Sequence, residues 1–353
     1  MGRFDHHLVT VVIPAFNAAA TLRATLNSAA AQSHRALEIL IVDDGSRDAT
    51  GAIAQAFCEQ EPRARQIRQD NRGVVAARNR GLNEACGEFI APLDADDLWH
   101  PDKIARQLAA ALAGPMPGFV YCWSRDIDGE DQVWRDGPAV THEGAVFLRM
   151  LAHNFVGNGS ALLVRRDAAL AVGGYRKELR SLGAEGVEDI VFQLDLAARY
   201  RAAVAPAYLV GYRWHAASAS YDHQAMLDAW LAARELVDRS GLTASRADRR
   251  NLARRRLLVS EALVRQRRLS DAARLGLAAF AGDPLRSGLA VSALIAHRIG
   301  KQGSANLVRP MFGDLPPEQA AFLPSAGIAA RLLGRLDTRR SERLAAEERL
   351  SST

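Results

Sequence analysis

The chain is short of cysteine, lysine and aromatic residues and has no long apolar run, and these shortages exclude several classes of protein. Its 353 residues contain three cysteines, too few and too widely spaced for a disulfide framework. No stretch reaches the roughly 18 consecutive apolar residues that a membrane-spanning helix requires. The first residues do not resemble a secretory signal, so we expect a cytoplasmic protein. With 48% apolar residues the chain can still bury a core and is not expected to be disordered.

Charge divides the chain into two parts. Residues 221–353 carry 22 basic and 14 acidic side chains, whereas residues 1–220 carry 23 basic and 26 acidic ones. The first part holds the short apolar runs and the turn signals, and the second is dominated by Ala, Leu and Arg. We therefore predict a first domain over 1–220, an α-helical module over 221–336, and a frayed or disordered tail over 337–353.

Short apolar runs alternate with helix-forming segments in the first domain. The pattern predicts strands over 8–13, 38–42 and 88–93, and helices over 18–31, 74–85 and 101–112, with a further helix after 46–50. Such alternation is typical of an α/β fold with an open, mostly parallel sheet flanked by helices. Ligands of these sheets bind beyond the carboxyl ends of the strands, which draws attention to the residues that follow each predicted strand.

Three carboxylates, Asp94, Asp96 and Asp97, follow the third predicted strand. Carboxylates so close together repel one another unless a cation or strong hydrogen-bond donors compensate. Mg²⁺ and Mn²⁺ bind such oxygens together with those of phosphates, so the cluster predicts a divalent metal site. The alternative is a solvated acidic turn that caps the helix after it.

Two more strand ends carry polar or aromatic residues. Asp44 follows the second strand and can accept a hydrogen bond from a nucleobase N–H or a ribose hydroxyl, although a helix-capping turn is the alternative. Pro14, Phe16 and Asn17 follow the first strand, where Phe16 can stack on a base unless the segment is a plain turn. Arg78 precedes the acidic cluster and can face a diphosphate, or it is a surface arginine.

These segments together resemble family 2 glycosyltransferases with a GT-A fold. VTVVIPAFNA, EILIVDDGSRDAT, NRGVVAARNRGL and FIAPLDADDLWHPDKI occur in the family's order and approximate spacing. Further on, GNGSALLVRRDAALAVGGYR, GVEDIVFQLDLA and YLVGYRWHAASAS resemble its acceptor-side segment, its Glu-Asp helix and its closing segment. The resemblance covers about residues 8–220. It implies an inverting enzyme that uses a nucleotide-sugar donor.

The resemblance also implies roles on the donor side. Asp94 and Asp96 would hold Mn²⁺ or Mg²⁺ against the donor diphosphate, and Asp97 is a replacement ligand for that ion. Asp44 would bind the base or the ribose. Phe16 would pack on the nucleobase, and Pro14, Asn17 and Arg78 would border the same site.

On the acceptor side, Asp189 matches the catalytic base of inverting members. An acceptor hydroxyl has to lose its proton, which a carboxylate within reach can accept. The alternative is a charge placed at a helix start by the helix dipole. Ile190 stands where many members have an aromatic residue, so the acceptor pocket should differ in shape. His215, in the closing segment, either completes the metal site or is an ordinary loop histidine.

Residues 222–282 read as three helices, broken near 240–241 and 269–270. Within them, residues 246–268 contain nine arginines and two acidic residues interleaved with apolar ones. Such a segment can lie on the anionic inner face of a cell membrane as a peripheral contact, or it can be a bundle helix with a solvated outer face.

The sequence thus predicts a metal-dependent inverting glycosyltransferase. It would move a sugar from a nucleotide-sugar, UDP-linked, to a hydroxyl of a glycan or lipid-linked acceptor, as in cell-surface polysaccharide assembly. A sugar-nucleotidyltransferase is the enzyme alternative, although PAFNAAATL is not the Gly-rich basic loop that such an enzyme needs after its first strand. An inactive nucleotide-sugar-binding scaffold is the alternative of another class. Nucleic acid is not an expected partner, because the positive charge lacks interleaved aromatic residues.

Overall fold

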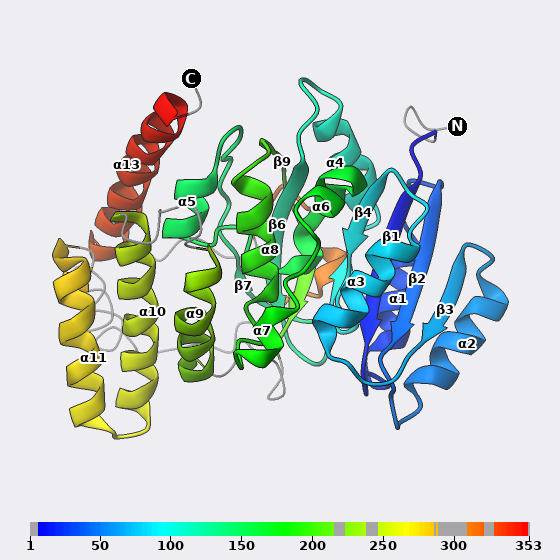
Figure 1. The fold of residues 1–353 in the computed structure, drawn as a ribbon, viewed down its shortest axis with the longest axis horizontal. Helices are drawn as coiled ribbons and strands as arrows, with labels where there is room; N and C mark the ends of the chain where they lie inside the picture. The colour runs from blue at the N-terminus through cyan, green and yellow to red at the C-terminus, as the bar shows by residue number, and fades with distance from the viewer. Residues whose placement is uncertain are drawn as a thin grey trace.

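The computed structural model describes residues 6–214, 223–237, 246–285, 287–288, 309–320 and 328–351. A sheet flanked by helices fills the centre and right of Figure 1, and a group of helices stands beside it on the left. The predicted domain boundary near 220 lies in a segment outside the described residues.

Four parallel strands form one half of the sheet, in the order β3-β2-β1-β4. They are β1 (Val9–Ala15), β2 (Leu37–Asp43), β3 (Ala64–Arg68) and β4 (Phe89–Pro92), connected by α1 (Leu22–Ala30), α2 (Thr50–Gln60) and α3 (Val74–Glu84). The strands and helices predicted here are confirmed. The sequence did not reveal β3, because its charged and polar side chains leave it only half-buried. At Gly81 an added Cβ would lie 2.2 Å from Val12 Cγ1, so glycine lets α3 pack directly on β1.

The other half of the sheet mixes strand directions and continues the order as β4-β8-β6-β9-β5, with β7 paired to β6. It contains β5 (Leu98–Trp99), β6 (Phe119–Ile127), β7 (Val133–Asp136), β8 (Leu162–Arg165) and β9 (Ala202–Arg213), with helices α4 (Lys103–Ala111), α5 (Phe147–Ala152), α6 (Arg166–Ala171), α7 (Glu178–Ser181) and α8 (Glu188–Ala197). β8 runs antiparallel to both of its neighbours, whereas β6 and β9 are parallel. The predicted fold class, an α/β sheet flanked by helices and followed by a helical part, is confirmed.

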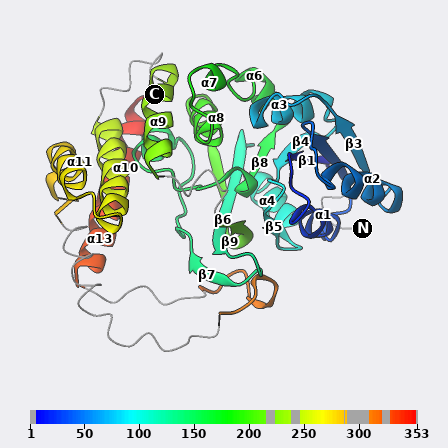
Figure 2. The ribbon, with the colours of Figure 1, turned by 90° about the horizontal axis from the view of Figure 1, so that it is seen from below.

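Three helices of the C-terminal part stand side by side next to the sheet (Figure 2). They are α9 (His223–Val237), α10 (Arg246–Arg265) and α11 (Leu269–Gly282), as the sequence predicts. α9 buries Trp230 in the main core, and α10 buries Val259 and Leu263 against its neighbours. The apolar side of 246–268 is thus covered by protein, which favours the bundle interpretation. Among the described residues no helix combines the length and apolarity needed to cross a bilayer.

The predicted frayed or disordered tail at 337–353 is largely wrong. Residues up to 351 belong to one helix, α13 (Ile328–Ser351), which lies against α5. Leu344 is buried, and Arg149 Nε donates to Glu348 Oε2 at 2.8 Å. The alternating Arg and Glu residues suggest a solvated segment, but some of these charges pair with residues distant in the sequence. The last two residues lie outside the described part.

Candidate active site

The acidic loop after β4 is held from two sides. The Thr25 hydroxyl, on α1, lies 3.0 Å from the carbonyl oxygen of Ala95 and 2.9 Å from that of Asp97. On the other side, the N–H of Asp94 donates to Ser160 Oγ at 3.0 Å, from the short 3-10 helix Gly159–Ala161. These contacts fix the loop at the carboxyl end of β4, where the sequence analysis expects the ligand.

The three carboxylates of this loop differ in their surroundings. Asp97 is buried and accepts hydrogen bonds from the Ser160 hydroxyl and from the N–H of Arg213. Its burial, and then the charges of Asp96 and Asp94, raise its pKa well above the usual range. Asp94 and Asp96 are instead half-buried. Asp97 therefore stabilises the loop internally, which disfavours its use as a replacement metal ligand.

Arg78 connects the acidic loop to α8. Its Nη2 lies 2.6 Å from Asp94 Oδ1 and its Nη1 lies 2.8 Å from Glu188 Oε1, and the guanidinium stands 5.2 Å from the centre of the Tyr175 ring. The side chain is almost fully buried. Arg78 was expected to face a diphosphate or solvent, but both ends of its guanidinium bind protein carboxylates. The prediction missed Glu188 as a partner, since nothing in the sequence pairs α3 with α8.

Asp189 lies next to this network, in the first turn of α8. A Cβ added at Gly159 would lie 3.6 Å from Arg78 Nη2, 3.8 Å from Asp189 Cβ and 3.9 Å from Asp94 Oδ2, so these three side chains converge on one glycine. Burial and the nearby Glu188 raise the pKa of Asp189 to about 7. The predicted base and the predicted metal loop, far apart in the sequence, are therefore neighbours. A carboxyl group with this pKa is suited to accept a proton near neutrality.

Asp44 binds a neighbouring loop. Its carboxylate accepts hydrogen bonds from Gln69 Nε2 at 2.7 Å, from the N–H of Arg72 at 3.0 Å and from that of Gly73 at 2.8 Å. The preceding residue, Asp43, closes the turn after β2, since its Oδ1 accepts from the N–H of Ser46, and Asp48 Oδ1 accepts from the N–H of Thr50 at the start of α2. Contact between Asp44 and a base or ribose stays a prediction.

The residues after β1 form a tight connection to the loop after β2. Asn17 has a positive φ of 50°, donates its N–H to Ser46 Oγ at 3.0 Å and accepts at Oδ1 from the N–H of Arg47. Phe16 is 50% exposed beside this connection, as a stacking residue should be. Pro14 does not end the strand as expected: it is buried within β1, opposite Val42. It supports the loop from beneath.

A metal could be held here by two residues. Asp94 and Asp96 are half-buried oxygen ligands on one short loop, and Mg²⁺ or Mn²⁺ commonly binds one or two carboxylates together with substrate phosphates. No group of three or more His, Cys, Asp or Glu side chains in the described part of the chain is arranged to bind a metal. His215, the third predicted ligand, lies outside the described residues. The two carboxylates of Asp94 and Asp96 suit a metal ion that also binds the oxygens of a diphosphate.

A cleft of about 810 Å³ opens beside Asp189, between the mixed half of the sheet and helices α9 and α10. Ile190 and Asn158 line it at the catalytic end. Trp134, Trp214 and Arg255 line it further out. The sequence analysis missed this cleft, because no local pattern indicates that α10 lies opposite β7 and β9.

Comparison with known proteins agrees with this architecture. The sheet flanked by helices matches the fold of solved GT-A-type structures. Residues 10–171 match the family model of Glycosyl transferase family 2. The chain therefore carries a family 2 glycosyltransferase domain, and this domain belongs to an enzyme family. The match ends before Asp189, so it does not cover the predicted base.

Individual relatives match over shorter segments. An uncharacterized glycosyltransferase of Nostoc sp. is 34% identical over 176 residues, which is 48% of this chain and 51% of the relative. The succinoglycan biosynthesis protein ExoO of Rhizobium meliloti is 43% identical over 106 residues, 30% of either chain. The chain thus matches about half of the Nostoc relative's length and under a third of ExoO's.

Two solved structures share the fold. One is S. aureus TarS 1-349 in complex with UDP-GlcNAc, with a TM-score of 0.56, 18% identity, and coverage of 77% of this chain and 81% of that one. The other is the mannosyltransferase PcManGT from Pyrobaculum calidifontis in complex with GDP-Man and Mn²⁺. It has a TM-score of 0.54, 22% identity, and coverage of 84% and 81%. At these identities the likeness concerns the fold.

Proposed function

We propose that the protein is an inverting glycosyltransferase that moves a sugar from a nucleoside diphosphate donor, UDP-linked, to a hydroxyl of a glycan or lipid-linked glycan. The observation that carries the proposal is the position of Asp189. Asp189, with a pKa of about 7, lies beside Asp94 at the edge of the sheet, and the next residue, Ile190, lines the cleft. ExoO, a relative in polysaccharide synthesis, supports a glycan acceptor.

In the proposed reaction, an acceptor hydroxyl in the cleft attacks the anomeric carbon from the side opposite the diphosphate. The new carbon–oxygen bond forms as the bond to the diphosphate oxygen breaks, and the nucleoside diphosphate leaves with the electron pair. Asp189 takes the hydroxyl proton during the attack. The Arg78 bridge to Asp94 and Glu188 fixes the start of α8, so that Asp189 faces the reacting atoms.

A divalent ion, Mn²⁺ or Mg²⁺, is part of the proposal, with Asp94 and Asp96 as its protein ligands. When bound it would supply a Lewis acid that neutralises the charge gathering on the leaving diphosphate. Phe16 would pack on the nucleobase, and Asp44 would orient the loop of residues 69–73 beside it. The structure of PcManGT with GDP-Man and Mn²⁺, which shares the fold, supports a nucleotide-sugar bound together with a divalent ion here.

The decisive experiment compares Asp189→Asn with Glu188→Gln. Asp189→Asn keeps the size of the side chain but removes the basic oxygen, so transfer should fall by roughly 10²–10⁴-fold. Donor binding, measured by calorimetry, should persist, because it depends on other residues. Glu188→Gln should lower thermal stability, since Glu188 pairs with the buried Arg78.

Two outcomes would contradict the proposal. If Asp189→Asn transfers sugar like the wild type, the base is another residue. If the wild type binds no nucleotide-sugar with or without Mn²⁺, the donor assignment is wrong. In the same assay Asp96→Ala should abolish the Mn²⁺-dependent part of nucleotide affinity, and Glu59→Ala, an exposed acidic change on α2, should leave it intact.

A further inference from the structure

The cleft beside Asp189 has one wall that belongs to the helical part of the chain. Ile190 and Asn158 line its catalytic end, while α10 provides Arg255 and Asn251. Its volume of about 810 Å³ lies in the range of pockets that hold small ligands, roughly 300–1,000 Å³. Whatever occupies this space therefore contacts the catalytic domain and the helical module together.

The opposite wall is aromatic. Trp134 on β7 and Trp214 after β9 meet edge to face, with ring centres 5.6 Å apart. Arg135 lies over both rings, at 4.9 Å and 5.3 Å, and is itself paired with Asp126. The two indole rings are half-buried, so part of each remains exposed. Indole rings of this kind offer apolar surface to the C–H faces of sugar rings beside polar groups for their hydroxyls.

Arg255 differs from the other charged residues in the site. Its Nε donates to Asn251 Oδ1 at 2.9 Å, and its guanidinium stands 4.8 Å from the centre of the Trp230 ring. Within the described part of the chain no carboxylate forms an ion pair with it, whereas Arg78 pairs with two carboxylates and Arg135 with one. Burial lowers the pKa of Arg255 to about 10, and the charge of Asp189 acts in the opposite direction. Arg255 is thus a half-buried cation within the electrostatic range of the proposed base.

A half-buried guanidinium is stabilised by an anion that accepts hydrogen bonds from its two Nη groups. The described residues supply no such anion to Arg255, so we expect the ligand of the cleft to supply it. We propose that this cleft is the acceptor subsite and that it takes an acidic glycan, whose carboxylate or phosphate binds Arg255 while its sugar rings pack on Trp134 and Trp214. The inference rests on the proposed function, because it names the acceptor class of the same site.

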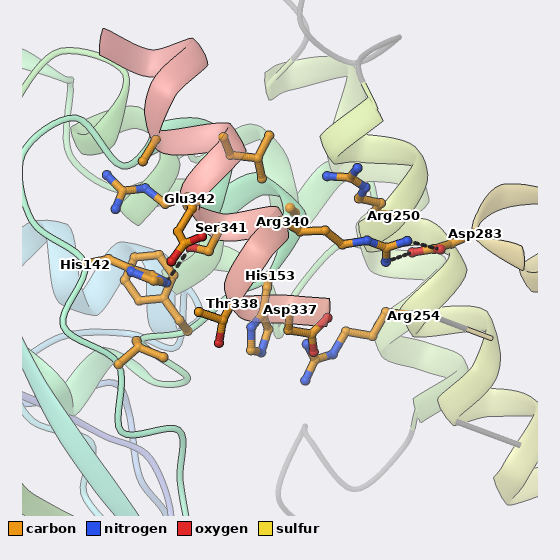
Figure 3. Close-up of a pocket in the computed structure, with 16 residues that line it drawn as sticks. His142, His153, Arg250, Arg254, Asp283, Asp337, Thr338, Arg340, Ser341 and Glu342 are labelled. Atoms are coloured by element: carbon orange, nitrogen blue, oxygen red, sulfur yellow. Dashed lines mark hydrogen bonds and ion pairs between the residues drawn. The ribbon is translucent and has the colours of Figure 1, made fainter. Parts of the chain in front are cut away.

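A second cavity extends the cleft. It encloses about 430 Å³ beneath α13, and Ala152, His153 and Arg254 line both cavities. Figure 3 shows His153 and Arg254 in its lower part, with Arg340 paired to Asp283 just above Arg254. The two cavities are therefore adjacent, and an acceptor that fills both would be a chain of several sugars.

The test measures binding of matched oligosaccharides to the full chain, by calorimetry and by tryptophan fluorescence. One probe alternates glucuronate with a neutral hexose, a second is its carboxyl-reduced form, and a third carries phosphate in place of the carboxylate. The wild type should bind an acidic probe about tenfold or more tightly than the neutral one, the effect of one charge-assisted contact. The preferred acidic probe identifies the anion.

Variants locate the contact. Arg255→Gln should abolish the preference for the acidic probe, and Arg255→Lys should retain part of it. Arg274→Gln, the same change on the exposed face of α11, should leave the preference unchanged. Trp134→Ala should weaken the acidic and neutral probes to a similar extent, because it removes packing and no charge.

The inference is overturned if the wild type binds the acidic and reduced probes equally, or binds no acidic probe, or if folded Arg255→Gln retains the preference. Nucleotide-sugar binding, measured on the same samples, separates this result from a failure of the proposed function. A wild type that binds donor but does not distinguish the probes retains its function and loses this acceptor. A wild type that binds no donor loses the function itself.

Discussion

The carboxyl edge of the parallel strands and the cleft beside α10 are adjacent, but they hold their charges differently. At the strand edge Arg78, Asp97 and Asp44 are buried and bonded to the protein itself. In the cleft Arg255 has no carboxylate partner among the described residues, and Trp134 and Trp214 are only half-covered. The first arrangement holds loops in place before any ligand arrives. The second arrangement leaves the Arg255 guanidinium and the two indole rings able to contact a ligand. Substitutions should therefore affect stability in the first region and binding in the second.

The largest effect is expected at Arg78. Arg78→Met keeps an apolar stem but leaves the carboxylates of Asp94 and Glu188 without their cation, one of them largely buried. We expect the free energy of unfolding to fall by about 3–5 kcal/mol, the usual result of breaking a buried ion pair. Urea denaturation of both proteins measures it.

Arg80→Met is the matched control, on the same helix. Arg80 is 51% exposed, and its one ion pair with a described residue is with Glu84, one turn along. Its loss should change stability by less than about 0.5 kcal/mol. Equal effects of the two substitutions would show that the strand edge is no more dependent on its internal pairs than the surface is.

Much of this strand edge could be predicted from the sequence. The segments after β1, β2 and β4 were identified because strand-like runs are short, β-branched and followed by polar residues, and parallel strands bring their carboxyl ends together. The acidic loop and Asp189 were placed on the correct elements. The inward use of Asp97 was not foreseen, since its partners Ser160 and Arg213 come from distant parts of the chain.

The cleft could not be predicted for a related reason. Its walls combine β7, the end of β9 and α10, and no periodicity or spacing pairs these segments. The arginines of 246–268 suggested a membrane surface or a solvated face, and only the packing of α10 shows that Arg255 lines the cleft. Likewise, α13 looked like a tail because its ion pairs, such as Arg149 with Glu348, are invisible in local composition.

A smaller loss of stability is expected at Asp44. In the wild type the two carboxylate oxygens of Asp44 accept hydrogen bonds from N–H groups of Gln69, Arg72 and Gly73. Asp44→Asn replaces one of these oxygens by an NH₂ group, which cannot accept a hydrogen bond. At least one partly buried donor then lacks its acceptor, which should cost about 1 kcal/mol. Thermal denaturation measures the loss. Asp70→Asn, an exposed change in the same loop, should leave the melting temperature unaltered.

Lys103 is a buried lysine whose ammonium group contacts no carboxylate of the described residues and does not line the cleft. Its Nζ donates to Gln107 Oε1 at 2.8 Å and lies 4.0 Å from the centre of the Trp99 ring. Burial lowers its pKa to about 7. Between pH 7 and the usual lysine pKa of about 10.4, the unfolded chain holds a proton that the folded chain lacks. The free energy of unfolding should therefore rise by about 1.4 kcal/mol per pH unit on account of this residue.

Denaturation curves at several pH values between 7 and 9.5 test this slope. In Lys103→Met the slope should be smaller by that amount, whatever the substitution does to stability at a single pH. Lys177→Met, at an exposed lysine, should preserve the wild-type slope. Identical slopes in the wild type and Lys103→Met would mean that Lys103 keeps its proton when the chain folds.

The smallest effect on stability is expected at Phe16. This residue tests the comparison between the strand edge and the cleft, because it lies at the strand edge but its ring faces outward. Its ring is 50% exposed, and the connection around it is held by Asn17 and Ser46. Phe16→Ala should therefore change stability by no more than about 0.5 kcal/mol. If the ring stacks on the nucleobase of the donor, affinity for the nucleotide should fall by about 1–3 kcal/mol, the usual contribution of base–aromatic stacking. Calorimetry with UDP and with ribose 5-phosphate separates the two cases: the loss should appear with the nucleotide and not with the sugar phosphate. If Phe16→Ala binds UDP like the wild type, Phe16 does not belong to the donor site. The strand edge would then be characterised only by its bonds within the protein.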